Sequence, residues 1–178
     1  MARQSRFHGV YLAMLPALIA VDWGTTALRG ALLSADGRVL AQQASARGLL
    51  SITEGGWAAA FEAEFGAWRR AHPGLPCLMA GMVGSRQGWV EAPYCACPAG
   101  PDDLAAHLLH LPPGAASHGG PVCIVPGLST EAAGTPDVMR GEETQIIGAL
   151  QTLGLTEATL VLPGTHSKWA TVQGGRIV

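Results

Sequence analysis

The amino-acid sequence predicts a mixed α/β fold that opens with a three-strand antiparallel meander, and three observations support this class. An apolar segment at residues 18–21 is followed by a short Gly-Thr turn and a second apolar segment at 28–33, the pattern of strand, tight turn and strand. Residues 57–71 carry large apolar side chains at three- and four-residue steps, as an amphipathic helix does. Short apolar segments such as 77–83 then alternate with helical ones, which is typical of buried strands.

The elements are expected in the order β-β-β-α-β-α-β-α, and a hairpin closes the chain. An Asp-Gly turn at 35–38 joins the second and third strands of the meander. The first helix carries basic residues near its end and stops before Pro73-Gly74. Strands are expected at 18–21, 28–33, 39–46, 77–83, 122–125, 159–162, 170–172 and 176–178, helices at 57–71, 102–111 and 141–153, and irregular segments at 91–100, 112–120 and 129–138.

Composition narrows the class of protein. The chain has 178 residues, enough for one domain or slightly more, and 48% of them are hydrophobic, so a sizeable core is expected. The formal net charge of -2 and the lack of a charged tail argue against a nucleic-acid partner. The four cysteines form no CxxC pair, which favours free thiols in a reducing compartment and therefore a cytoplasmic protein.

The N-terminus needs a separate interpretation. Arg3 and Arg6 precede an apolar run at 9–21, which resembles the charged and apolar regions of a signal peptide. Pro16 interrupts this run, no small-x-small cleavage site follows, and the run is too short and broken for a membrane span. Residues 1–17 are therefore interpreted as an N-terminal extension, with Met14 as a possible alternative start, and no membrane partner is expected.

The turn after the first strand has the composition of a phosphate site. A carboxylate, Asp22, is followed by Gly24, Thr25 and Thr26. Glycine lets the backbone approach a phosphate, hydroxyls and N–H groups donate to its oxygens, and an Asp can hold Mg²⁺ directly or through water. The alternative is an ordinary hairpin turn with a capping Asp. Arg29, on the strand that leaves the turn, is a further candidate or simply a surface residue of an edge strand.

A second turn of similar composition lies near the end of the chain. Gly164, Thr165 and His166 follow the apolar strand at 159–162, and Lys168 is placed to add positive charge near phosphates. The repetition predicts two similar domains, the first at 18–157 and the second beginning at 158–178. The other histidines show no metal-ligand spacing.

Four stretches follow one another along the chain: Asp22-Trp-Gly-Thr-Thr-Ala-Leu-Arg29, Met79-Ala-Gly-Met-Val-Gly-Ser85 with Gly88-Trp89, Val138-Met-Arg-Gly-Glu-Glu-Thr-Gln145, and Pro163-Gly-Thr-His-Ser-Lys-Trp169. In this order they resemble the 2-dehydro-3-deoxygalactonokinase family of the actin/hexokinase/Hsp70-type ATPase superfamily. The resemblance implies a ribonuclease-H-like, actin-type ATPase domain that uses ATP and Mg²⁺ to phosphorylate the terminal 6-hydroxyl of 2-dehydro-3-deoxy-D-galactonate in galactonate catabolism. It also implies enzymes about twice as long as this chain, so the sequence resembles their N-terminal part, with the second domain truncated.

The same resemblance suggests roles for residues around the third stretch. Sugar kinases of the superfamily carry a Gly-Asp where this chain has Gly141-Glu142, which makes Glu142 the expected general base and Glu143 the alternative. Simple capping of the helix by these carboxylates is the other interpretation. An acidic substrate needs a cationic contact, for which Arg86 and Arg140 are candidates unless they are solvated loop residues. Ser85 and Trp89 are expected to line the same pocket.

Two alternatives remain open at the level of function. The chain could be a catalytically dead sugar-acid-binding fragment, or another carbohydrate kinase of the same superfamily. The expected partners are a small sugar acid and ATP, and a homo-oligomer is possible.

Overall fold

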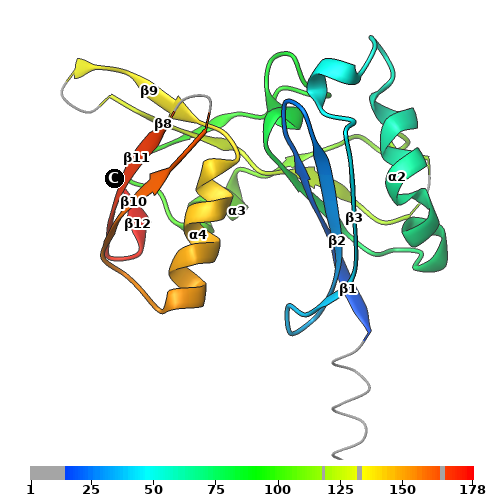
Figure 1. Ribbon diagram of the computed structural model, residues 1–178, viewed down its shortest axis with the longest axis horizontal. Helices are drawn as coiled ribbons and strands as arrows, with labels where there is room; N and C mark the ends of the chain where they lie inside the picture. The colour runs from blue at the N-terminus through cyan, green and yellow to red at the C-terminus, as the bar shows by residue number, and fades with distance from the viewer. Residues whose placement is uncertain (1–14, 118, 132–133, 165–166) are drawn as a thin grey trace, which may run out of the picture. The chain divides into compact units, whose positions relative to one another are not determined.

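The computed structural model describes residues 15–117, 119–131, 134–164 and 167–178, and these form a mixed α/β fold (Figure 1). The chain divides into two compact units. The first comprises Met1–Met79 and His110–Cys123, and the second comprises Ala80–Leu109 and Ile124–Val178. The domain boundary expected at residue 158 stays a prediction. Among the described residues, no helix combines the length and the apolar character needed to cross a bilayer.

The predicted meander is confirmed in the first unit. Its first two strands pair antiparallel, with Asp22 opposite Arg29, and the third strand pairs antiparallel with the second. The whole sheet has the strand order β3-β2-β1-β4-β7-β6. Its strands are β1 (Pro16–Trp23), β2 (Leu28–Ser34), β3 (Val39–Ser45), β4 (Cys77–Ala80), β6 (Leu109–His110) and β7 (Val122–Ile124).

Helix α2 (Trp57–Ala71) has the predicted bounds and packs on the meander (Figure 1). Phe61 and Phe65 are fully buried on its inner face, and each such burial stabilises the fold by about 1.5–3 kcal/mol. A Cβ on Gly30 of β2 would lie 2.1 Å from a ring carbon of Phe65, so only glycine at this position lets α2 approach the strand so closely. A short 3-10 turn, η1 (Leu49–Ser51), precedes the helix.

Two predicted elements of the middle of the chain were too long. The strand expected at 77–83 ends at Ala80, because Gly81 adopts a φ of +95° and a 3-10 turn, η2 (Met82–Gly84), follows. The helix expected at 102–111 is α3 (Pro101–Ala106). The chain then forms β6, since the adjoining Leu111 N–H donates to the carbonyl of Val122, the first residue of β7.

The second unit contains strands in segments that were expected to be irregular. Strand β5 (Tyr94–Ala96) lies within 91–100, and β8 (Gly127–Thr130) and β9 (Asp137–Met139) overlap the expected loop at 129–138. They form a sheet of order β5-β8-β9, in which β5 and β8 are parallel although more than 30 residues separate them. Such short strands exist because of partners that are distant in sequence, so local pattern does not reveal them.

The helix and hairpin predicted at the end of the chain are confirmed. Helix α4 (Glu142–Leu153) ends at Gly154, whose φ of +65° is the usual left-handed helix stop. A sheet of order β10-β11-β12 follows, and its last turn contains Gly174 and Gly175, both with positive φ. The strands are β10 (Ala158–Leu162), β11 (Lys168–Gln173) and β12 (Arg176–Ile177).

Candidate functional site

The turn between β1 and β2 is closed by its own backbone and held by a neighbouring segment. The N–H of Gly24 donates to the carbonyl of Ala27 at 2.9 Å, which makes the turn tight. The N–H groups of Leu49 and Leu50 donate to the carbonyls of Gly24 and Thr25 at 3.0 and 3.1 Å. These contacts use the turn's carbonyls and leave the side chains of Thr25 and Thr26 exposed to solvent.

Asp22 is oriented by its buried neighbour. Because successive strand residues point to opposite faces, the burial of Trp23 directs the Asp22 side chain outward. Trp23 is fully buried, packs edge-to-face on Trp57 at 5.1 Å between ring centroids, and donates from Nε1 to the carbonyl of Arg47 at 2.8 Å. The Asp22 carboxylate forms an exposed ion pair with Arg29 at 3.2 Å, and such pairs contribute little to stability.

A second group of predicted residues lies at the start of α4. Gly141 precedes the helix with a φ of +104°, which a side chain rarely tolerates, and a Cβ there would lie 3.2 Å from the Cα of Gly81. Its N–H donates to Glu143 Oε2 at 2.7 Å, and the N–H of Arg140 donates to Glu142 Oε2 at 3.0 Å. Both carboxylates therefore bind the backbone that enters the helix, as the capping interpretation expected.

The two glutamates differ in access to solvent. Glu142 is half-buried, whereas Glu143 has no exposed surface. Burial raises the pKa of the Glu143 carboxyl from 4.5 to about 7, although hydrogen bonds from the Gly141 N–H and the Thr144 hydroxyl oppose this rise. The Glu143 carboxyl thus has a pKa near neutral pH, but it has no exposed surface that a ligand could contact. The Glu142 side chain does have exposed surface.

The raised pKa of Glu143 predicts a pH-dependent stability. Between its unfolded pKa of 4.5 and its folded pKa of about 7, the folded state binds more protons than the unfolded state. The free energy of unfolding should therefore fall as the pH rises through this window, by up to about 3 kcal/mol. Urea unfolding between pH 4.5 and 8 measures this fall. It should largely vanish in Glu143→Gln and persist in the control Glu131→Gln, which changes an exposed loop residue; an unchanged slope in Glu143→Gln would contradict the assignment.

Arg140 has unused hydrogen-bonding capacity. Its Nη2 donates to the carbonyl of Ala92 at 2.8 Å, and its guanidinium lies 4.3 Å from the ring centre of Tyr94. Its Nε and Nη1 atoms are buried and have no hydrogen-bond partner among the described residues, and the same holds for the hydroxyl of Ser85. A Cβ on Gly84 would lie 3.1 Å from Arg140 Nη1, so glycine next to Ser85 lets the guanidinium come close to this segment. The unpartnered donors suit an anionic ligand.

The remaining predicted residues are placed as follows. Arg86 is exposed and Trp89 half-buried, in the loop that follows η2. Lys168, at the start of β11, forms an ion pair with Asp137 of β9, which lowers the pKa of the Asp137 carboxyl. The sequence did not indicate Asp137 as a partner of Lys168, because Asp137 lies in a segment that was expected to be a loop. Gly164 is exposed in the turn between β10 and β11, and Thr165 and His166 lie outside the described residues.

Comparisons with known proteins agree on one family. The family model described as 2-keto-3-deoxy-galactonokinase matches residues 22–178. A Rhizobium meliloti (strain 1021) protein named as a probable 2-dehydro-3-deoxygalactonokinase is 38% identical over 159 residues, which cover 89% of this chain and 50% of the relative. The 2-dehydro-3-deoxygalactonokinase of Escherichia coli (strain K12) is 37% identical over 165 residues, covering 92% of this chain and 52% of the relative.

A solved structure supports the same relationship. A crystal structure of a Sinorhizobium meliloti protein described as a putative 2-dehydro-3-deoxygalactonokinase matches with a TM-score of 0.79 at 38% identity, covering 90% of this chain and 52% of that one. The chain spans about half the length of the curated relatives it matches. The family match extends over most of the sequence, and the chain belongs to the 2-keto-3-deoxy-galactonokinase family.

Proposed function

We propose that this chain is part of an ATP-dependent sugar-acid kinase that phosphorylates the terminal 6-hydroxyl of 2-dehydro-3-deoxy-D-galactonate. The observation that carries the proposal is the pair of unpartnered guanidinium donors on Arg140, in the segment that also holds Glu142. The segment thus combines a cation suited to the carboxylate of a sugar acid with a carboxylate suited to accept a hydroxyl proton. Family membership supports this choice of substrate.

The fold proposed for the first unit is ribonuclease-H-like, of the actin type. The support is the antiparallel meander β3-β2-β1, extended on the β1 side by β4 and β7. In this proposal the turn after β1 contacts phosphate, through Gly24, Thr25 and Thr26. Neither space nor φ requires glycine at position 24, because a Cβ there would make only an ordinary contact of 3.6 Å with the Ala27 carbonyl. Close approach of a phosphate accounts for a glycine at this position.

Asp22 is the proposed Mg²⁺ ligand. Mg²⁺ is usually held by one or two carboxylates together with waters and substrate phosphates, so a single outward carboxylate beside two exposed hydroxyls fits it. When bound, the ion would neutralise charge on the phosphates of ATP. Arg29 already pairs with this carboxylate. Gly164, Thr165, His166 and Lys168 remain proposed second contacts to phosphate.

In the proposed chemistry, Glu142 accepts the proton of the substrate hydroxyl. Its half-buried side chain gives it surface for a ligand, whereas Glu143 is fully covered. Glu143 is assigned a positioning role, since its Oε2 holds the Gly141 N–H that begins α4. Arg140 and Ser85 bind the carboxylate of the sugar acid, and Arg86 and Trp89 line its approach.

Replacing Arg140 by lysine should weaken substrate binding selectively. Lysine keeps the positive charge but loses the planar fork, so the KM for the sugar acid should rise about 10–100-fold, the equivalent of about one charged hydrogen bond. The KM for ATP should stay unchanged. Steady-state kinetics measure both, with Arg176→Lys as the matched control, because Arg176 is an exposed arginine paired with Asp103. Equal effects of the two variants would contradict the role of Arg140.

Two measurements on the same preparation test the proposed function. A coupled assay detects ADP formation from MgATP in the presence of 2-dehydro-3-deoxy-D-galactonate. Calorimetry detects binding of the sugar acid without ATP. ADP formation that depends on this sugar acid supports the kinase, and binding without turnover would indicate the binding-only alternative. Turnover with another sugar but not with this acid would point to another carbohydrate kinase. No binding and no turnover would contradict the proposal.

A further inference from the structure

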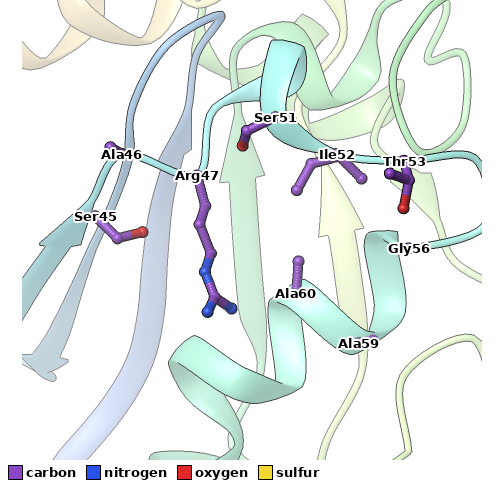
Figure 2. Close-up of a pocket in the computed structure, with 9 residues that line it drawn as sticks. All are labelled: Ser45, Ala46, Arg47, Ser51, Ile52, Thr53, Gly56, Ala59 and Ala60. Atoms are coloured by element: carbon purple, nitrogen blue, oxygen red, sulfur yellow. The ribbon is translucent and has the colours of Figure 1, made fainter.

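The first unit contains an open pocket of about 700 Å³ that the proposed kinase chemistry does not use. It lies between the end of β3, the segment that includes η1, and the start of α2 (Figure 2). Apolar walls come from Ile52, Ala59 and Ala60, and polar side chains come from Ser45 and Arg47. None of the nine described lining residues carries a carboxylate.

Two side chains give the pocket a preference for negative charge. The guanidinium of Arg47 is half-exposed, and its ion pair with Glu64 is long at 3.5 Å, so an anion can compete for it. The hydroxyl of Ser45 is buried and has no hydrogen-bond partner among the described residues. Figure 2 shows this hydroxyl turned toward the Arg47 side chain. An unpartnered buried donor beside a cation is unusual unless a ligand satisfies it.

The start of α2 adds to the same preference. The first N–H groups of a helix have no intrahelical acceptor, and the helix dipole places partial positive charge there. At α2 the N-cap is Gly56, which supplies no side-chain cap, and the first turn contains no acidic residue. Ala59, in this first turn, lines the pocket and is exposed.

We propose that this pocket binds a small oxyanion, the phosphate or carboxylate group of a small molecule, between Arg47, Ser45 and the start of α2. The apolar side of the pocket would contact the body of that molecule. Phosphate and carboxylate share the acceptor geometry that an Arg and helix N–H groups recognise.

An occupant of this pocket would be coupled to the turn after β1. The backbone carbonyl of Arg47 accepts the Trp23 indole N–H. The N–H groups of Leu49 and Leu50, two and three residues further on, donate to the carbonyls of Gly24 and Thr25. A Cβ on Gly48 would lie 2.3 Å from the backbone of Thr26, so the backbones of these two residues are closely packed. A movement of the 47–50 segment is therefore transmitted to the turn.

Amide NMR spectra of the labelled chain, titrated with inorganic phosphate and separately with glycerate, test the proposal. We expect saturable shifts at residues 57–59 with at least one probe, and shifts of Gly24 and Thr25 with the same dissociation constant. Saturation by phosphate alone identifies a phosphate group, and saturation by both identifies a general oxyanion site. Absence of saturable shifts with both probes overturns the site, and saturation without shifts at the turn overturns the coupling.

A matched pair of variants separates this site from non-specific charge effects. Ala59→Glu places a carboxylate in the pocket at a position where the helix dipole favours it, and Ala63→Glu places the same charge one turn further along the helix, also on an exposed residue. Ala59→Glu should weaken binding at least about tenfold, whereas Ala63→Glu should change it less than about twofold. Equal weakening by the two variants would overturn the assigned position. Dispersed amide spectra verify that both variants fold.

Discussion

Replacing Trp23 by alanine should lower the free energy of unfolding by about 3–5 kcal/mol, the range for large-to-small changes in a core. The side chain has no exposed surface and packs edge-to-face on Trp57. Its removal leaves a cavity and also deprives the Arg47 carbonyl of the Nε1 donor. Both changes affect the segment that contacts the turn after β1. The substitution should therefore lower the stability of the protein and also alter the geometry of that turn.

Urea unfolding followed by far-UV circular dichroism measures this effect. The matched control is Trp169→Ala, because Trp169 is the same residue type on a strand but is 74% exposed. An exposed substitution of this kind is expected to change stability by no more than about 0.5 kcal/mol. A Trp23→Ala variant as stable as Trp169→Ala would show that Trp23 does not anchor the turn.

Replacing Glu142 by glutamine should lower kcat by about 10²–10⁴-fold in a preparation with kinase activity, the usual contribution of a general base. Glutamine keeps the size of the side chain and an oxygen that accepts the Arg140 N–H, so the start of α4 should be preserved. The KM for the sugar acid should change little, because the proposed carboxylate contacts come from Arg140 and Ser85. The measurement is the coupled ADP assay at saturating MgATP.

Further substitutions separate a catalytic role of Glu142 from a structural one. Glu142→Asp should keep part of the activity, since it keeps the carboxylate, and Glu131→Gln, a change on an exposed loop, should keep all of it. If Glu142→Gln retains full turnover while Glu143→Gln abolishes it, the base is Glu143 and the assignment made from exposure is wrong. In that case the raised pKa of Glu143 would mark the catalytic group.

Much of the fold could be predicted from local pattern. Helix α2 was predicted with its observed bounds, because its apolar residues recur at helical spacing over four turns and Pro73-Gly74 follows. The meander was equally clear, since two apolar strands flank a glycine turn. By contrast, β5, β6, β8 and β9 have two to four residues each and were missed or taken for helix or loop. So few residues carry no readable period, and distant partners define these strands.

The candidate site, like the fold, could be predicted from the sequence only in part. The sequence alone determined which residue types occur together: Asp22 with the Gly-Thr turn, and Arg140 with Glu142 and Glu143. Only the tertiary structure decided what each group can do. It buried Glu143 and so raised the pKa of its carboxyl, left two donors of Arg140 without partners, and paired Lys168 with Asp137. The reason is physical: chemical identity is local, whereas desolvation and hydrogen-bond satisfaction depend on neighbours that the fold brings from distant positions in the chain.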